Sequence, residues 1–201
     1  MKKLLLIFCL GILVTSGTAQ MRKGVGLTTG TQGSGFHFSG NWQLKEDLIA
    51  GFEIRFFDIK NEAELPVYNP YTGEQFNVGD KALIMFPAFG SIRWLPFEGK
   101  IANNFSPFVE AKFGPVLAID GNDEYRKFNK RWRKAPIINT YGGQIVIGVS
   151  FLQMGGAMIS PSIGFEFLPM GRIVDDKKSY DGTTINTVSY THLTLPTILL
   201  V

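Results

Sequence analysis

Apolar and polar residues alternate along most of this chain, and the alternation is clearest between residues 35 and 57. Two alternating runs meet there at the polar turn Lys45-Glu46-Asp47. Successive side chains of a strand point to opposite faces, so each run predicts a strand with one apolar face, and the short link predicts a hairpin. The same pattern predicts an all-β chain with strands at residues 24–30, 35–44, 48–57, 81–97, 108–120, 137–152 and 157–168, and an eighth that begins at residue 183.

The predicted strand at residues 81–97 is the least regular. Leu83, Met85 and Phe89 make its second face apolar as well, and Pro87 has no N–H group to donate to a neighbouring strand. We expect a β-bulge or a local twist at Pro87.

The opposite faces of the predicted strands carry charged and hydrogen-bonding groups. A water-soluble barrel turns such groups outward, whereas a barrel in a lipid bilayer has an apolar outer face and can hold polar groups in its lumen. Several apolar faces here are as long as the about 9–11 residues that a tilted strand needs to cross the hydrocarbon. We therefore predict an antiparallel up-and-down transmembrane β-barrel of about eight strands, with a polar lumen network formed by His37, Asn41, Gln43, Glu53, Arg55, Arg93, Glu110, Lys112, Gln144 and Glu166.

Long and short links alternate along the chain, as they do in transmembrane barrels. Residues 61–80, 121–136 and 169–182 predict long loops on one side, whereas residues 45–47 and 154–156 are short returns on the other. A basic stretch in the second long loop is expected to contact anionic lipopolysaccharide, and an ordinary solvated loop is the alternative. That stretch contains Arg126, Lys127, Lys130, Arg131, Arg133 and Lys134.

Both ends of the sequence read as segments outside the folded domain. Residues 1–19 combine a basic start, an apolar run and a small-residue end, which is typical of a secretory signal peptide cleaved after Ala19. Residues 187–201 read as the translation of a sequencing adapter, so we expect a truncated last strand and a native barrel domain over residues 20–186. Resequencing across Asn186 would test this expectation.

Charge and cysteine content exclude several classes of function. The 20 Lys and Arg residues, less Lys2 and Lys3, leave 18 against 17 Asp and Glu, and this near-neutral balance gives no support to nucleic-acid binding. The one cysteine, Cys9, lies in the predicted signal peptide, which leaves no disulfide or cysteine-metal site. We expect no catalytic residues, no metal and no cofactor.

The chain resembles the small eight-stranded outer-membrane β-barrels of Gram-negative bacteria, the group of OmpA-type and OmpX-type barrels. The resemblance covers residues 23–185 and rests on the alternation, the unequal links and the signal peptide. It implies Sec-type export through the periplasm, assembly by the barrel-insertion machinery, and contact with outer-membrane lipid and lipopolysaccharide. The chain departs from the group at its end, because Val201 stands where such barrels usually have an aromatic residue. The function implied is a non-enzymatic, largely closed barrel whose surface loops serve envelope integrity or surface interaction.

Three alternatives stay open on the sequence. The lumen could line a small, porin-like pore for modest solutes, although eight strands leave little more room than their side chains need. His37 and Ser39, two apart on one strand, resemble a local feature of lipid A deacylases, but they are expected to face the lumen, and no acidic partner is apparent. Residues 40–42 match the short Gly-x-Trp signal of lipocalins, yet a lipocalin would have to expose Phe36 and Phe52 to water.

Overall fold

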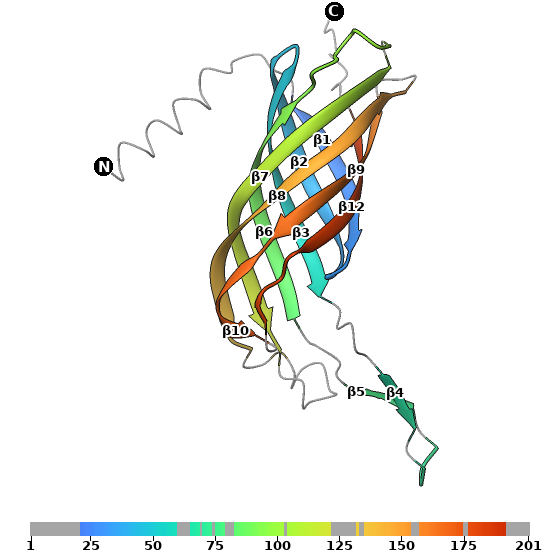
Figure 1. Ribbon diagram of the computed structural model, residues 1–201, viewed down its shortest axis with the longest axis vertical. Helices are drawn as coiled ribbons and strands as arrows, with labels where there is room; N and C mark the ends of the chain where they lie inside the picture. The colour runs from blue at the N-terminus through green and yellow to red at the C-terminus, as the bar shows by residue number, and fades with distance from the viewer. Residues whose placement is uncertain are drawn as a thin grey trace, which may run out of the picture.

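The chain forms a closed barrel of antiparallel strands (Figure 1). The structure is a computed structural model that describes residues 21–59, 65–68, 70–73, 75–78, 83–102, 104–121, 132, 135–153, 157–174 and 177–191. Neighbouring barrel strands follow one another in sequence, apart from two inserted hairpins, and the first and last strands pair to close the ring. The predicted all-β, up-and-down barrel of eight strands is thus confirmed. In order around the ring, the barrel strands are β1 (Arg22–Gly30), β12 (Gly182–Thr191), β9 (Met158–Phe167), β8 (Ile137–Leu152), β7 (Phe105–Asp120), β6 (Leu83–Trp94), β3 (Leu48–Ile59) and β2 (Gly33–Lys45).

Two short hairpins lie within segments that the sequence predicts as long loops. One pairs β4 (Leu65–Tyr68) with β5 (Gln75–Val78), and the other pairs β10 (Pro169–Val174) with β11 (Lys177–Ser179). Both lie at the end of the barrel opposite to the turn between β2 and β3 (Figure 1). These loops are therefore partly strands. The segments that leave two adjacent barrel strands begin side by side, and their backbone N–H and C=O groups pair with each other. We call this end of the barrel the loop end, and the end with the β2–β3 turn the turn end.

Apolar side chains cover the outside of the barrel, and polar side chains fill the middle of its interior. On the outside, Phe113 is 67% exposed and Ile145 is 64% exposed. Inside, Glu53 is 4% exposed and Arg55 is 0% exposed. A water-soluble barrel such as a lipocalin has the reverse arrangement, so the distribution matches a barrel surrounded by lipid.

The interior becomes apolar at the loop end. Leu83, Met85 and Phe89 of β6 point inward there and are buried. β6 is therefore a regular strand that is apolar on both faces, because its inner face lines an apolar part of the lumen. Side chains of the β10 region pack on the same residues and cover this end. We call the cluster the loop-end layer; it comprises Phe57, Ile59, Leu83, Met85, Phe89, Val116, Ala118, Ile138, Leu168, Met170, Val174 and Tyr180.

No β-bulge forms at Pro87, so that part of the expectation is wrong, whereas the local twist stays a prediction. Ile54 of β3 faces Ala88, and Phe57 faces Met85, which is the same register on both sides of the proline. The pairs between these two are absent from the ladder. A proline removes a backbone donor without adding a residue, so hydrogen bonds are lost while the register is kept.

The last strand, β12, continues past Asn186 to Thr191 and pairs with both β1 and β9. Val188 and Tyr190 keep the inward phase of the strand and are buried. Strand pairing requires backbone groups and an alternating phase rather than particular side chains, so residues 187–191 complete β12 whatever their origin, and the truncation of the native strand at residue 186 stays a prediction. The adapter origin of residues 187–201 concerns the gene sequence and stays a prediction.

The predicted signal peptide, residues 1–19, lies outside the described residues, as does the short return at residues 154–156. Within the part of the chain that the structure describes, no helix is long and apolar enough to cross a bilayer.

Candidate functional site

Glu53, on the inner face of β3, holds two cations in the middle of the lumen. Its Oε1 accepts hydrogen bonds from Arg55 Nη2 at 2.7 Å and from Arg55 Nε at 3.2 Å. Its Oε2 accepts a hydrogen bond from Lys112 Nζ at 2.6 Å. Glu53 and Arg55 are two residues apart, so the alternation of β3 places both on the inner face. Both carboxylate oxygens are therefore bound by charged donors, which form the stronger class of hydrogen bond.

Arg55 crosses the barrel from wall to wall. Its Nη1 donates to Glu166 Oε1 at 2.8 Å, and its Nη2 donates to Gln144 Oε1 at 3.1 Å. Glu166 lies on β9, which is four strands away from β3 in either direction around the ring. The guanidinium group therefore bridges opposite walls and occupies the centre of the lumen.

A second ion pair lies nearer the turn end. Arg93 Nη2 donates to Glu110 Oε2 at 3.0 Å, and Lys112 Nζ lies 3.9 Å from the same oxygen. Arg93 Cζ also lies 4.1 Å from the ring centroid of Phe108, within the range of a cation–π interaction. Three cations and three carboxylates therefore balance inside the barrel, as buried charges require. We call these six side chains the ionic network: Glu53, Arg55, Arg93, Glu110, Lys112 and Glu166.

His37 approaches the ionic network from β2. Its Nε2 lies 3.7 Å from Glu53 Oε2, and its Nδ1 lies 3.1 Å from Thr28 Oγ1. Gly26 leaves room for this ring, because a Cβ at that position would clash with Nε2. The sequence suggested no acidic partner for His37 and Ser39, and that expectation is wrong, because Glu53 lies beside the imidazole.

This His–Ser–Glu group is enclosed rather than exposed to lipid. His37 is 0% exposed and Ser39 is 8% exposed, and both point into the lumen. The carboxylate of Glu53 is already held by two cations. A nucleophile must reach its substrate, so the arrangement gives no support to the deacylase alternative.

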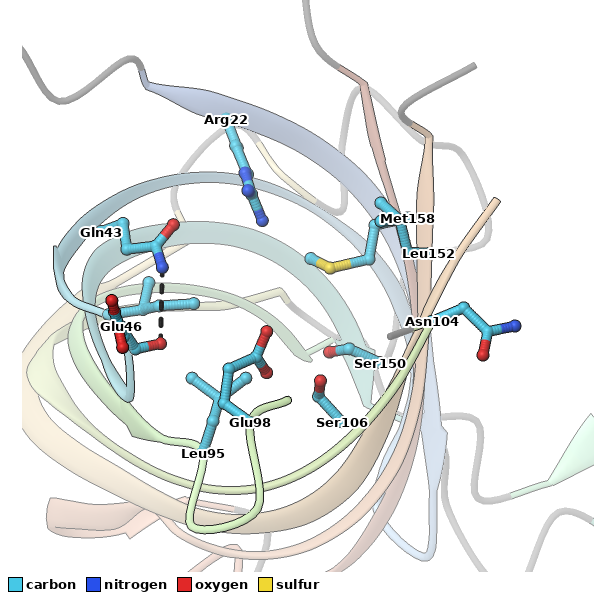
Figure 2. Close-up of a pocket in the computed structure, with 11 residues that line it drawn as sticks. Arg22, Gln43, Glu46, Leu95, Glu98, Asn104, Ser106, Ser150, Leu152 and Met158 are labelled. Carbon is cyan, nitrogen blue, oxygen red and sulfur yellow. Dashed lines mark hydrogen bonds between the residues drawn. The ribbon is translucent and has the colours of Figure 1, made fainter. Parts of the chain in front are cut away.

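A small vestibule opens at the turn end of the lumen (Figure 2). Its volume is about 90 Å³, and Arg22 and Glu98 point into it from different sides of the opening. Gln43, predicted for the lumen network, is exposed here, and its Nε2 donates to the backbone carbonyl of Glu46 at 3.4 Å.

An apolar layer separates this vestibule from the ionic network. Ile49 and Leu95 line the vestibule and pack with Phe108 and Val146 in one buried cluster. We call these four residues the turn-end layer. The charges of the lumen are therefore covered by apolar side chains at both ends.

Comparison with known proteins identifies the fold. No protein-family model matches the sequence, and no curated protein matches it. The structure is similar to Neisserial surface protein A (NspA), with a TM-score of 0.56 and 9% sequence identity over 86% of this chain and 95% of that chain. The chain has the fold of a small outer-membrane β-barrel.

Two further solved structures match this barrel with TM-scores of 0.49. One is Ail, the attachment invasion locus protein of Yersinia pestis, at 10% identity over 86% of this chain and 97% of that chain. The other is the N-terminal β-barrel domain of Pseudomonas aeruginosa OprF, at 8% identity over 86% and 98% of the two chains. Identities this low restrict the likeness to the fold.

Nine of the ten side chains predicted for the lumen are buried, and Gln43 is the exception. Asn41 is 4% exposed, but among the described residues its Nδ2 has no hydrogen-bond partner. Gln144 joins the ionic network through Arg55. The loop residues predicted to contact lipopolysaccharide, Arg126, Lys127, Lys130, Arg131, Arg133 and Lys134, lie outside the described residues.

Sequence reasoning missed the short polar side chains of the first and last strands. Thr28 Oγ1 donates to Asn186 Oδ1 at 2.8 Å, and Gln144 Nε2 donates to Thr184 Oγ1 at 2.7 Å. Their inward phase in the alternation was the available signal, but Thr28 contrasts little with the glycines around it, and Thr184 and Asn186 lie where the last strand was expected to be cut off. Within the described residues, no group of three His, Cys, Asp or Glu side chains could hold a metal ion.

Proposed function

We propose that this protein is a non-enzymatic integral outer-membrane β-barrel with a polar, largely closed lumen, whose loops serve surface interaction or envelope integrity. The observation that carries the proposal is the inversion of the barrel: Ile145 is 64% exposed on the wall, while Arg55 is 0% exposed at the centre. Burying balanced charges and exposing isoleucine and phenylalanine is favourable only where the surroundings are hydrocarbon.

Three obstacles in series support a closed lumen rather than a pore. Arg55 bridges opposite walls at the centre of the barrel. The turn-end layer lies on one side of it, and the loop-end layer lies on the other. An eight-stranded barrel has an interior just wide enough for side chains, and here side chains fill it.

The partners in this proposal follow from the location. The apolar wall would contact outer-membrane lipid, the basic loop at residues 126–134 would contact lipopolysaccharide, and the barrel-insertion machinery would assemble the chain after Sec-type export. The surface ligand would be bound by the loops at the loop end, where two of the long links form hairpins.

The first prediction concerns location and closure. Full-length protein is expected in the outer-membrane fraction and is expected to migrate faster on a detergent gel without boiling than after boiling. A closed barrel resists unfolding by detergent because every strand has two hydrogen-bonded neighbours. Recovery in the soluble periplasmic fraction, with no shift on boiling, would refute the proposal.

The second prediction concerns conductance. Purified barrel in a planar bilayer is expected to give no long-lived conductance steps, because the ionic network lies between two apolar layers. Regular steps of defined size would instead establish the small-pore alternative.

A further inference from the structure

An apolar groove marks the outer wall of the barrel at the turn end. It has a volume of about 540 Å³ and is lined by residues of β1, β2, β3 and β12. Val25 and Phe38 border it and are 56% and 54% exposed. Gly40 leaves the wall without a side chain, and Met21 and Phe52, which also line the groove, lie close over it. The volume falls within the roughly 300–1,000 Å³ of ligand sites.

Lys23 contributes the one charged side chain to this groove lining. It lies on the outward phase of β1, is exposed, and faces Gly40 in the register with β2. Among the described residues, Lys23 makes no ion pair. An unpaired ammonium group beside an apolar groove is complementary to a ligand that joins an anionic group to a hydrocarbon chain.

Tryptophan side chains show how deep the groove lies. Trp42 follows Gly40 by two residues on the outer face of β2, and its ring lies 5.7 Å from the ring of Phe52. Trp94, the last residue of β6, is 52% exposed at the same end. Tryptophan is enriched at the boundary between hydrocarbon and head groups. Lys23, which faces Gly40, therefore lies near this boundary, where its long side chain reaches toward the lipid phosphates, and Val25 lies deeper in the hydrocarbon.

We propose that this groove is a binding site for one anionic phospholipid of the leaflet at the turn end, an inference that rests on the membrane location proposed for the barrel. One acyl chain lies against Val25, Phe38 and Phe52, and the lipid phosphate accepts a hydrogen bond from Lys23. The site prefers phosphatidylglycerol to phosphatidylethanolamine, because the ammonium group of the latter competes with Lys23 for the phosphate.

The test uses full-length, delipidated barrel in detergent and native mass spectrometry with added phosphatidylglycerol or phosphatidylethanolamine. Lys23→Ala is expected to weaken retention of one phosphatidylglycerol about five-fold, the effect of one basic residue near an anionic lipid surface. Val25→Trp, which adds a ring to the groove, is expected to weaken retention of both lipids. Lys45→Ala is the matched control, because Lys45 is an exposed lysine at the same end of the barrel but outside the groove.

Equal retention by the Lys23→Ala and Lys45→Ala variants would overturn the inference, as would equal retention of the two lipids by the unaltered protein. Either result would show that the groove binds lipid no more selectively than the rest of the apolar wall. The gel migration of each variant separates this failure from that of the proposed function: a barrel that shifts on boiling but shows no lipid preference refutes the lipid site alone.

Discussion

Replacement of Glu53 by Gln is expected to destabilise the barrel by about 3–5 kcal/mol, the cost of removing one partner from a buried ion pair. Glu53 is the counter-ion of both Arg55 and Lys112, whose donors lie 2.7 Å and 2.6 Å from its oxygens. Glutamine keeps the shape but removes the charge, so a buried cation loses its compensation. Arg55 retains Glu166 at 2.8 Å, whereas Lys112 retains Glu110 at the longer distance of 3.9 Å, so the largest loss falls on Lys112.

The measurement is the free energy of unfolding in lipid vesicles, followed by tryptophan fluorescence during a urea titration. Glu46→Gln is the control, because Glu46 lies exposed in the β2–β3 turn and its replacement is expected to change stability by no more than about 0.5 kcal/mol. The double variant Glu53→Gln with Lys112→Met removes a charge of each sign. It is expected to lose less stability than the sum of the single variants, as residues in one ion-pair network do. Strict additivity would contradict the pairing.

Much of this fold could be predicted from the sequence, because a membrane barrel repeats one simple pattern. Alternation with period two placed the barrel strands, and the chemical nature of the two faces indicated which one is inside. Glu53 and Arg55 illustrate this: neither residue belongs to a motif, but both lie on the face of the strand opposite Phe52 and Ile54. The prediction succeeded where each residue could be assigned to a face independently of the others.

The sequence could not predict which lumen charges meet. Arg55 and Glu166 are 111 residues apart, and their contact depends on the stagger of the strands around the ring. That stagger is set by the closure of the whole barrel, and no local stretch encodes it. The contact of His37 with Glu53 depends instead on the register of the β2–β3 hairpin, which sets Glu53 opposite Ser39, two residues from His37.

The apolar layers escaped prediction for a different reason. A polar lumen was expected along the full length of every strand. The apolar residues Leu83, Met85 and Phe89 on the inner face were therefore interpreted as an irregular strand. The barrel instead changes its interior from charged to apolar toward the loop end, where the β10 hairpin covers it. Apolar residues in the inward phase near a strand end are therefore a usable signal for a closed lumen.

Replacement of Ile145 by Arg tests the assignment of the outer face most directly, and it is expected to destabilise the barrel by about 2–4 kcal/mol, the depth-dependent cost of a basic residue at the middle of a bilayer. Ile145 is 64% exposed and follows Gln144, which joins the ionic network at the centre of the barrel. In water an exposed isoleucine accepts arginine at a cost within about 0.5 kcal/mol. The two surroundings therefore predict different results for one substitution.

Ile137→Arg is the matched control, because it makes the same change on the same outer face of β8. Ile137 is 62% exposed, but it is the first residue of the strand, at the loop end. There the cost is expected to fall to about 0–1 kcal/mol, as at a membrane interface. The measurement is the unfolding free energy of both variants in vesicles of one lipid. Because the two positions share residue type, strand and exposure, a larger loss at Ile145 can come only from the depth of surrounding hydrocarbon, and equal small losses would place water around the whole wall.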